Sequence, residues 1–206
     1  MAKQVHRQFD YEVNRLFARR TYYLRHLIRR RSPGKAPTFN AKRLRPKIRL
    51  LQDLTEVSIA NNKFFRKEFS SLVQFSKRWH PRKGGRRGAD SKRKGFDRFW
   101  QNRIGNRNFV YIFRQDRVCR YVGRTGGGRK RPQAHFSRRW FPRVTRIDVH
   151  VAQYSYLPKL ECLATHRFQP INNKIRPSAR KWAKKCSICK VRRDVRTELK
   201  RIFRLR

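Results

Sequence analysis

Acidic residues are scarce in this sequence of 206 residues, which also has only four cysteines and one methionine. Asp and Glu number 12 against 57 Lys and Arg, so the formal net charge is +45. A chain of this charge repels itself, and a polyanion is its natural counterweight. Because the basic residues extend along the whole chain, we expect a nucleic-acid partner rather than an acidic protein. DNA is favoured over RNA or ribosomal RNA, and the sequence does not indicate an oligomeric state.

The cysteines are too few and too scattered for a dense disulfide framework. They indicate a reducing intracellular compartment, either the cytoplasm or nucleoid or an organelle. No apolar run approaches the ~20 residues of a membrane-spanning helix, so no membrane partner is expected. The N-terminus lacks the apolar core of a secretory signal. Its Arg-rich start is compatible with an organelle transit peptide, against which Asp10 and Glu12 argue.

Two stretches before residue 80 show helical periodicity. Apolar residues recur at helical spacing from 9 to 31, with arginines on the other face, and Ser32-Pro33-Gly34 ends the pattern. After a basic connector, a second helical pattern runs from Ile48 to Phe75, and Asn61-Asn62 interrupts it. We predict a basic helical extension over residues 1–79. It is either a helical hairpin or a dedicated DNA- or RNA-binding module.

Residues 80–105 are predicted to be a flexible basic linker, because glycine and positive charge replace apolar periodicity over 80–95. Beyond it, β-rich runs at 109–113 and 118–122 predict a hairpin, and alternation over 144–151 predicts a third strand. Helices are predicted over 132–139 and 157–168. The predicted fold class is therefore α/β in the broad sense, and more narrowly α+β. It consists of a small three-stranded antiparallel sheet flanked by helices within residues 106–176. A basic C-terminal tail, residues 177–206, follows with a helix near 194–203.

Several short motifs occur in a particular order between residues 107 and 175. Phe109-Val110-Tyr111 and Tyr121-Val122-Gly123 lie on the two hairpin strands, and Arg131, His135, Glu161 and Pro170-Ile171-Asn172-Asn173 follow. This ordered set resembles the GIY-YIG nuclease superfamily, which carries a Gly-Ile-Tyr strand, a Tyr-Ile-Gly strand, an arginine, a histidine, a glutamate and an asparagine. Each motif alone is weak, whereas the ordered set is specific. The first motif has Phe109 where the family has glycine, and we expect this ring to alter the pocket or the path of the substrate.

The resemblance implies a metal-dependent endonuclease that hydrolyses phosphodiester bonds with one divalent cation, Mg²⁺ or Mn²⁺. The catalytic residues that it implies are Tyr111, Tyr121, Arg131, His135, Glu161 and Asn173. Glu161 is the only carboxylate between Asp148 and Asp194, and one carboxylate suffices for a cation that keeps several waters. Tyr111 would be the general base, its phenolate favoured by nearby cations, and Arg131 would stabilise charge on the phosphate. Tyr121 and His135 would position the attacking water or relay its protons, and Asn173 would orient its neighbours.

Other residues are candidates for contacts with phosphates or with a second metal. The expected phosphate contacts are Arg124, Arg129, Lys130, Lys174, Arg82, Lys83, Arg86 and Arg87. Cys186-Ser187-Ile188-Cys189 has the spacing of half a zinc site, which Cys162, His166 or Cys119 could complete in space. The alternative is a pair of reduced cysteines at the start of a helix.

A second hypothesis follows from the charge. A net charge of +45 exceeds what the cutting of DNA requires. It suits a ribosome- or mitoribosome-associated RNA-binding structural protein, built on a GIY-YIG-like fold without catalysis. The intact set of motif residues favours the enzyme, because a scaffold has no reason to keep it.

Overall fold

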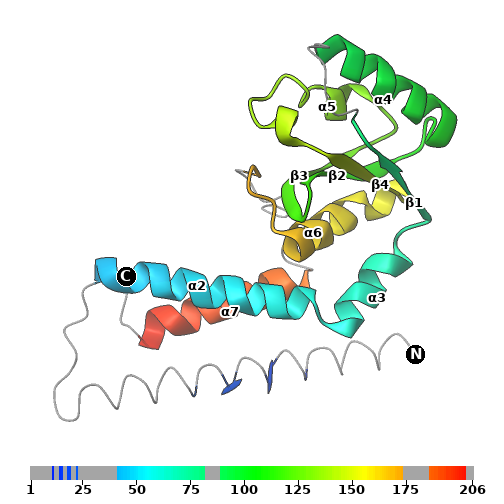
Figure 1. Ribbon diagram of the computed structural model, residues 1–206. Coiled ribbons are helices and arrows are strands. Elements are labelled where there is room, and N and C mark those ends of the chain that lie inside the picture. Colours follow the sequence, from blue (N-terminus) through cyan, green and yellow to red (C-terminus); the bar gives the residue numbers. More distant parts are fainter. Residues whose placement is uncertain are drawn as a thin grey trace, which may run out of the picture. The chain divides into compact units, whose positions relative to one another are not determined.

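The computed structural model describes residues 41–81, 89–173 and 186–202 (Figure 1). It also describes six isolated helical positions, Tyr11, Asn14, Arg15, Ala18, Arg19 and Tyr22. Only the backbone is described at 41–48, 89, 90, 187, 200 and 202. The chain divides into two compact units, Met1–Arg66 with Lys184–Arg206 and Lys67–Ala183. Most of the helix predicted over 9–31 lies outside the described residues.

In the first unit, helix α2 (Ala41–Ala60) packs against helix α7 (Ser187–Ile202). Ile59 of α2 and Ile188, Val195 and Leu199 of α7 are buried. Both helices begin earlier than the sequence patterns predicted, at Ala41 rather than Ile48 and at Ser187 rather than Asp194. No helix in the described part of the chain is both long and apolar enough to cross a membrane.

The predicted interruption at Asn61-Asn62 is confirmed. Helix α2 ends at Ala60, and helix α3 (Lys63–Ser71) begins after the two asparagines. The side-chain oxygen of Asn62 accepts a hydrogen bond of 2.9 Å from the backbone N–H of Phe64. This bond satisfies one of the N–H groups that the first turn of α3 would otherwise leave without a partner.

The second unit is built on an antiparallel sheet of four strands, not the three that were predicted. The strands are β1 (Phe75–Trp79), β2 (Phe109–Gln115), β3 (Val118–Thr125) and β4 (Arg146–Val151), in the order β1-β4-β2-β3. The additional strand is β1, which lies at the end of the predicted helical extension, residues 1–79, and shares only Phe75 with the predicted helical pattern. Its Phe-Ser-Lys-Arg-Trp sequence carries little strand signal. It is a strand because it pairs with β4, far away in the sequence, and because Phe75 and Trp79 pack against the core.

Helix α4 (Ala89–Arg103) lies in the segment that was predicted to be a flexible linker. Phe96 and Trp100 stand one helical turn apart and are buried in the core together with Ile104, which follows the helix. The apolar positions come late in this segment, after a glycine-rich basic stretch that hid the helical pattern. The helix is therefore stabilised by its contacts with the sheet rather than by its own composition.

Helices cover both faces of the sheet (Figure 1). Helix α4 and the short helix α5 (Lys130–Gln133) lie over one face, and helix α6 (Leu157–Phe168) packs against β2 and β3. Side chains of β2, β4 and α4 form an aromatic and aliphatic core, whose β2 members are Phe109, Tyr111 and Phe113. The helix predicted over 132–139 is shorter than expected, because after α5 the chain continues in tight turns, with His135 N–H donating to the carbonyl of Pro132 (3.2 Å).

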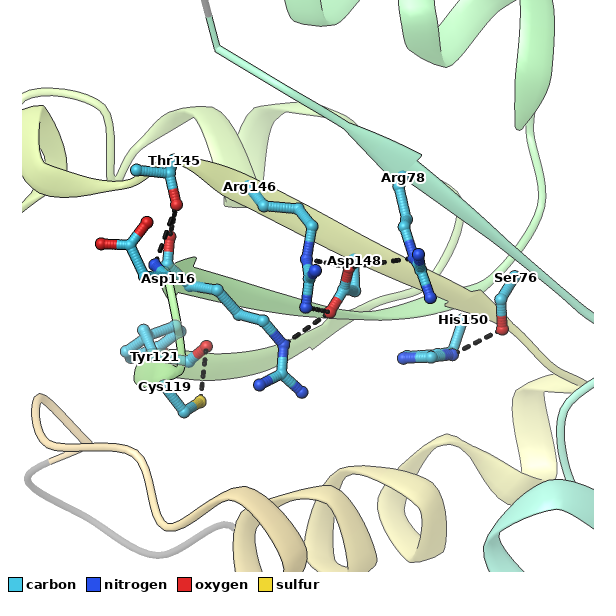
Figure 2. A network of polar contacts seen from close by, with 10 residues as sticks. Ser76, Arg78, Asp116, Cys119, Tyr121, Thr145, Arg146, Asp148 and His150 are labelled. Carbon is cyan, nitrogen blue, oxygen red and sulfur yellow. Dashed lines mark hydrogen bonds and ion pairs between the residues drawn. The ribbon is translucent and has the colours of Figure 1, made fainter.

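A buried carboxylate holds three of the strands together (Figure 2). Asp148 of β4 is only 6% exposed, and one of its oxygens lies 2.6 Å from Nε of Arg114 on β2. The other oxygen lies 2.9 Å from Nε of Arg146 and 3.8 Å from Nε of Arg78 on β1. Beside this group, Ser76 Oγ lies 2.6 Å from Nδ1 of His150. Burial lowers the pKa of His150 to about 4, so its ring is neutral at pH 7.

Candidate active site

Gly123 allows Tyr111 to lie across the edge of the sheet. The two residues face each other in the register of β2 and β3, and β3 is the edge strand. A Cβ atom at Gly123 would lie 2.6 Å from both Cζ and the hydroxyl oxygen of Tyr111. No carbon side chain fits in this space. The hydroxyl end of Tyr111 therefore passes over β3 only because residue 123 has no side chain.

Two tyrosines and a histidine meet at this edge. The Tyr111 hydroxyl lies 3.4 Å from Nε2 of His135, in the turn after α5. The His135 ring lies 4.2 Å, centroid to centroid, from the ring of Tyr121 on β3. Trp140 stacks on Tyr121 at 5.9 Å with 17° between the planes. Sequence reasoning missed Trp140, because it lies in irregular turns where no periodicity marks a side chain as part of a site.

Arg131 and Glu161 act electrostatically on both tyrosines. Burial raises the pKa of Tyr111, and the charge of Glu161 adds to this effect, whereas the charge of Arg131 and its hydrogen bond lower it. Burial likewise raises the pKa of Tyr121, with Arg131 and Glu161 acting in the same directions as before. The structure therefore brings together five of the six predicted catalytic residues. For Tyr111 the net effect opposes the expected phenolate, because burial outweighs the nearby cations.

His135 is a neutral imidazole at pH 7. Burial lowers its pKa to about 4, and the charges of Arg138 and Arg131 act in the same direction. A neutral ring has one nitrogen that can accept a proton. The proton acceptor next to Tyr111 is thus a histidine whose charge does not change near physiological pH.

Glu161 lies on α6 and is only 7% exposed. Burial raises its pKa, and the positive charges of Arg124 and Arg131 oppose that shift. Nε of Arg124 lies 2.9 Å from one carboxylate oxygen of Glu161. The carboxylate oxygens of Glu161 are ligands of the type that Mg²⁺ prefers, so this residue fits a hard divalent cation. The charge of Glu161 also acts on the same two tyrosines as Arg131, which places the carboxylate near them. For the cation to use both oxygens, Arg124 has to give up its ion pair.

Asn173, the sixth predicted catalytic residue, contacts the backbone of the edge strand. Its side-chain oxygen accepts a hydrogen bond from the N–H of Val122 (3.0 Å), and its NH₂ group donates to the carbonyl of the same residue (2.8 Å). The N–H of Asn172 donates to the carbonyl of Arg120 (2.9 Å). The segment therefore runs along the outer edge of β3 and supplies its edge groups with partners.

Phe109, which stands where the family has glycine, is buried in the core. Its ring lies 6.2 Å from that of Tyr111 in an edge-to-face arrangement. Phe109 is 0% exposed, so its ring packs within the core beside Tyr111 and does not face solvent. The extra bulk is accommodated by the core.

Two of the predicted phosphate-binding residues make ion pairs within the protein. Arg124 pairs with Glu161, and Arg129 lies 2.6 Å from a carboxylate oxygen of Asp97 and over the ring of Trp100. Lys130 is exposed. The remaining predicted contacts, Arg82, Lys83, Arg86, Arg87 and Lys174, lie outside the described residues.

A second group of chemically active side chains involves the cysteines. Cys162, His166, Cys186 and Cys189 form a group that could hold a metal ion. Thiolates and imidazole suit zinc rather than Mg²⁺. All four cysteines lie in the described part of the chain, and none of them is in a disulfide. The predicted Cys186–Cys189 pair thus has Cys162 and His166 as its companions, whereas Cys119 is not part of the group.

Comparison of the chain with protein-family models, with curated proteins and with solved structures found no match in any of the three.

Proposed function

We propose that this protein is a nucleic-acid-binding endonuclease of the GIY-YIG type, which hydrolyses phosphodiester bonds with one divalent cation. The observation that carries the proposal is the convergence of Tyr111, Tyr121, Arg131, His135 and Glu161 on one edge of the sheet. These residues come from β2, β3, α5 and the turn after it, and α6. A set of general acid–base, cationic and carboxylate groups in one place is what hydrolysis of a phosphodiester requires.

Tyr111 and His135 together accept the proton of the attacking water. Tyr111 holds its own proton at neutral pH, because burial raises its pKa. Its hydroxyl can accept the water proton only while passing that proton on, and Nε2 of the neutral His135 lies 3.4 Å away. In this step the water O–H bond breaks and the water oxygen bonds to phosphorus, while the bond from phosphorus to the leaving 3′ oxygen breaks. Tyr111 takes up the water proton and passes its own proton to His135.

Arg131 would stabilise the negative charge of the phosphate directly, and Glu161 would do so through a bound cation. Arg131 is exposed, so its guanidinium can reach a phosphate from solvent. Glu161 would hold the divalent cation, which when bound polarises the scissile phosphate and stabilises the leaving 3′ oxygen. The side chain of Arg124 is 38% exposed and can turn from Glu161 to a neighbouring phosphate once the cation is bound.

The net positive charge of the chain favours nucleic acid as its partner. Each neutralised phosphate releases a condensed counterion, so a chain of net charge +45 gains strongly on a polyanion. DNA remains the favoured substrate. Binding should weaken steeply as salt is raised, whichever nucleic acid is cut.

The test is cleavage of supercoiled plasmid with Mg²⁺ or Mn²⁺. We expect Glu161→Gln, which keeps the shape of the side chain and removes its charge, to lower the cleavage rate by ~10²-fold or more. Glu68→Gln is the matched control, because Glu68 lies in the same unit and pairs with Lys159 (2.7 Å) away from the tyrosines. Both variants should bind DNA like the unmodified protein in fluorescence anisotropy. Equal cleavage rates for the two variants would rule out the assigned role of Glu161.

The structural RNA-binding alternative has one observation in its favour. Burial keeps Tyr111 protonated and Glu161 is paired with Arg124, an arrangement that a scaffold without catalysis could also have. This alternative predicts co-sedimentation of the native protein with ribosomal particles and no cleavage of DNA or RNA with any divalent metal. Metal-dependent cleavage that disappears in Glu161→Gln excludes it.

A further inference from the structure

Helix α6 carries half of a metal-binding group. Cys162 and His166 are four residues apart on this helix, a spacing that places two side chains on one face, one turn above the other. Both residues are only 1% exposed. A thiol and an imidazole at this spacing can ligate the same ion.

The start of α7 carries the other half. Cys186 directly precedes the helix, and Cys189 lies in its first turn. Cys186 is 4% exposed and Cys189 is half-buried. Two intervening residues allow both sulfur atoms to reach one ion. The N-terminal end of a helix also favours the negatively charged thiolate, the form that binds a metal.

We propose that Cys162, His166, Cys186 and Cys189 bind a structural zinc ion. Three thiolates and one imidazole are a complete tetrahedral set, so no coordination position is left for a substrate or for water. On binding, each cysteine forms a sulfur–zinc bond and releases its proton to solvent. Two of the four ligands come from α6, one directly precedes α7 and one lies in its first turn. The zinc ion is distinct in chemistry and in role from the hard cation proposed at Glu161.

The buried positions of these cysteines have a competing explanation without a metal, because reduced cysteines often serve as small apolar core residues. Cys119 of β3 is the example within this chain. It is 4% exposed, its hydrogen bond goes to a backbone carbonyl (3.9 Å), and it has no place in the four-residue group. Cys119 is therefore the matched control for the loss of one buried thiol.

The first experiment measures the metal content of the full-length protein purified without chelator. We expect one zinc per chain. Cys186→Ser and His166→Ala each remove a direct ligand, so we expect each to lower the affinity for zinc by more than the ~10–100-fold that loss of a group hydrogen-bonded to a ligand costs. Cys119→Ser should leave the affinity unchanged, and His166→Cys should retain the metal as a four-cysteine site. Unmodified protein that contains no zinc and takes up none would overturn the proposal, even where a variant fails to fold. Equal zinc loss in Cys119→Ser and Cys186→Ser would also overturn it.

The second experiment replaces zinc by Co²⁺ in the unmodified protein. Tetrahedral thiolate ligation gives strong visible absorption and a sulfur-to-cobalt charge-transfer band, and both should be retained in Cys119→Ser and lost in Cys186→Ser. An octahedral Co²⁺ spectrum would contradict the four assigned ligands. Neither readout involves cleavage, so the zinc site and the nuclease activity are tested independently of each other.

Discussion

Replacement of Gly123 by alanine tests the placement of the Tyr111 hydroxyl. The backbone tolerates this change, because the positive-φ glycines of the described chain are Gly105 and Gly127 rather than Gly123. The new Cβ would lie 2.6 Å from Cζ of Tyr111 and 2.8 Å from Cε1 of Tyr121. Carbon atoms pack at about 3.5–4.0 Å, so the ring of Tyr111 has to retreat by ~1 Å.

A retreat of this size removes the hydroxyl from its contact with His135, which is already 3.4 Å long. A misplacement of ~1 Å costs on the order of 10²-fold in rate, which is the loss that we expect for Gly123→Ala in single-turnover plasmid cleavage. The affinity for DNA should not change. Overpacking should also lower the free energy of unfolding by ~1–3 kcal/mol, as measured with urea.

Gly95→Ala is the matched control. Its new Cβ would meet only Cζ2 of Trp79, at an ordinary distance of 3.5 Å, so we expect full activity and no loss of stability. A second check uses the Tyr111→Phe background, in which Gly123→Ala should cost little further activity because no hydroxyl is left to misplace. Wild-type cleavage by Gly123→Ala, or an equal loss in Gly95→Ala, would refute the assigned role of the Tyr111 hydroxyl.

Three further predictions concern stability and can be checked by urea unfolding. Asp148→Asn leaves three arginines around a neutral amide and should destabilise the protein by about 3 kcal/mol, partly restored by salt, whereas exposed Asp116→Asn should have no effect. Asn173→Ala removes two hydrogen bonds to the β3 backbone and should cost ~1–2 kcal/mol, and an unchanged unfolding midpoint would show that water replaces them. Burial lowers the pKa of His150 from 6.5 to about 4, so its contribution to stability is present above pH 6.5 and is lost as the pH falls toward 4. His150→Gln should flatten the stability profile in that window.

The hairpin, the strand at 146–151 and the helix at 157–168 could be predicted because their signals are local. Strand alternation, a short turn and the proline at the start of α6 act within a few residues. Strand β1 and helix α4 could not be predicted in the same way. Phe75 and Trp79 stand in a strand only because β4 supplies the hydrogen bonds, and the helical pattern of α4 becomes visible only where Phe96 and Trp100 meet the core.

By itself, the sequence determined the net positive charge on which the proposed nucleic-acid partner rests, the order of the motif residues and the Cys-x-x-Cys pair. These properties depend on charge and on spacing along the chain, which folding does not change. The tertiary structure alone decided that Tyr111 crosses the edge strand over Gly123, that its neighbour His135 is neutral, and that Arg124 pairs with Glu161. The physical reason is that burial and distance set these interactions, and both depend on residues that lie far apart in the sequence.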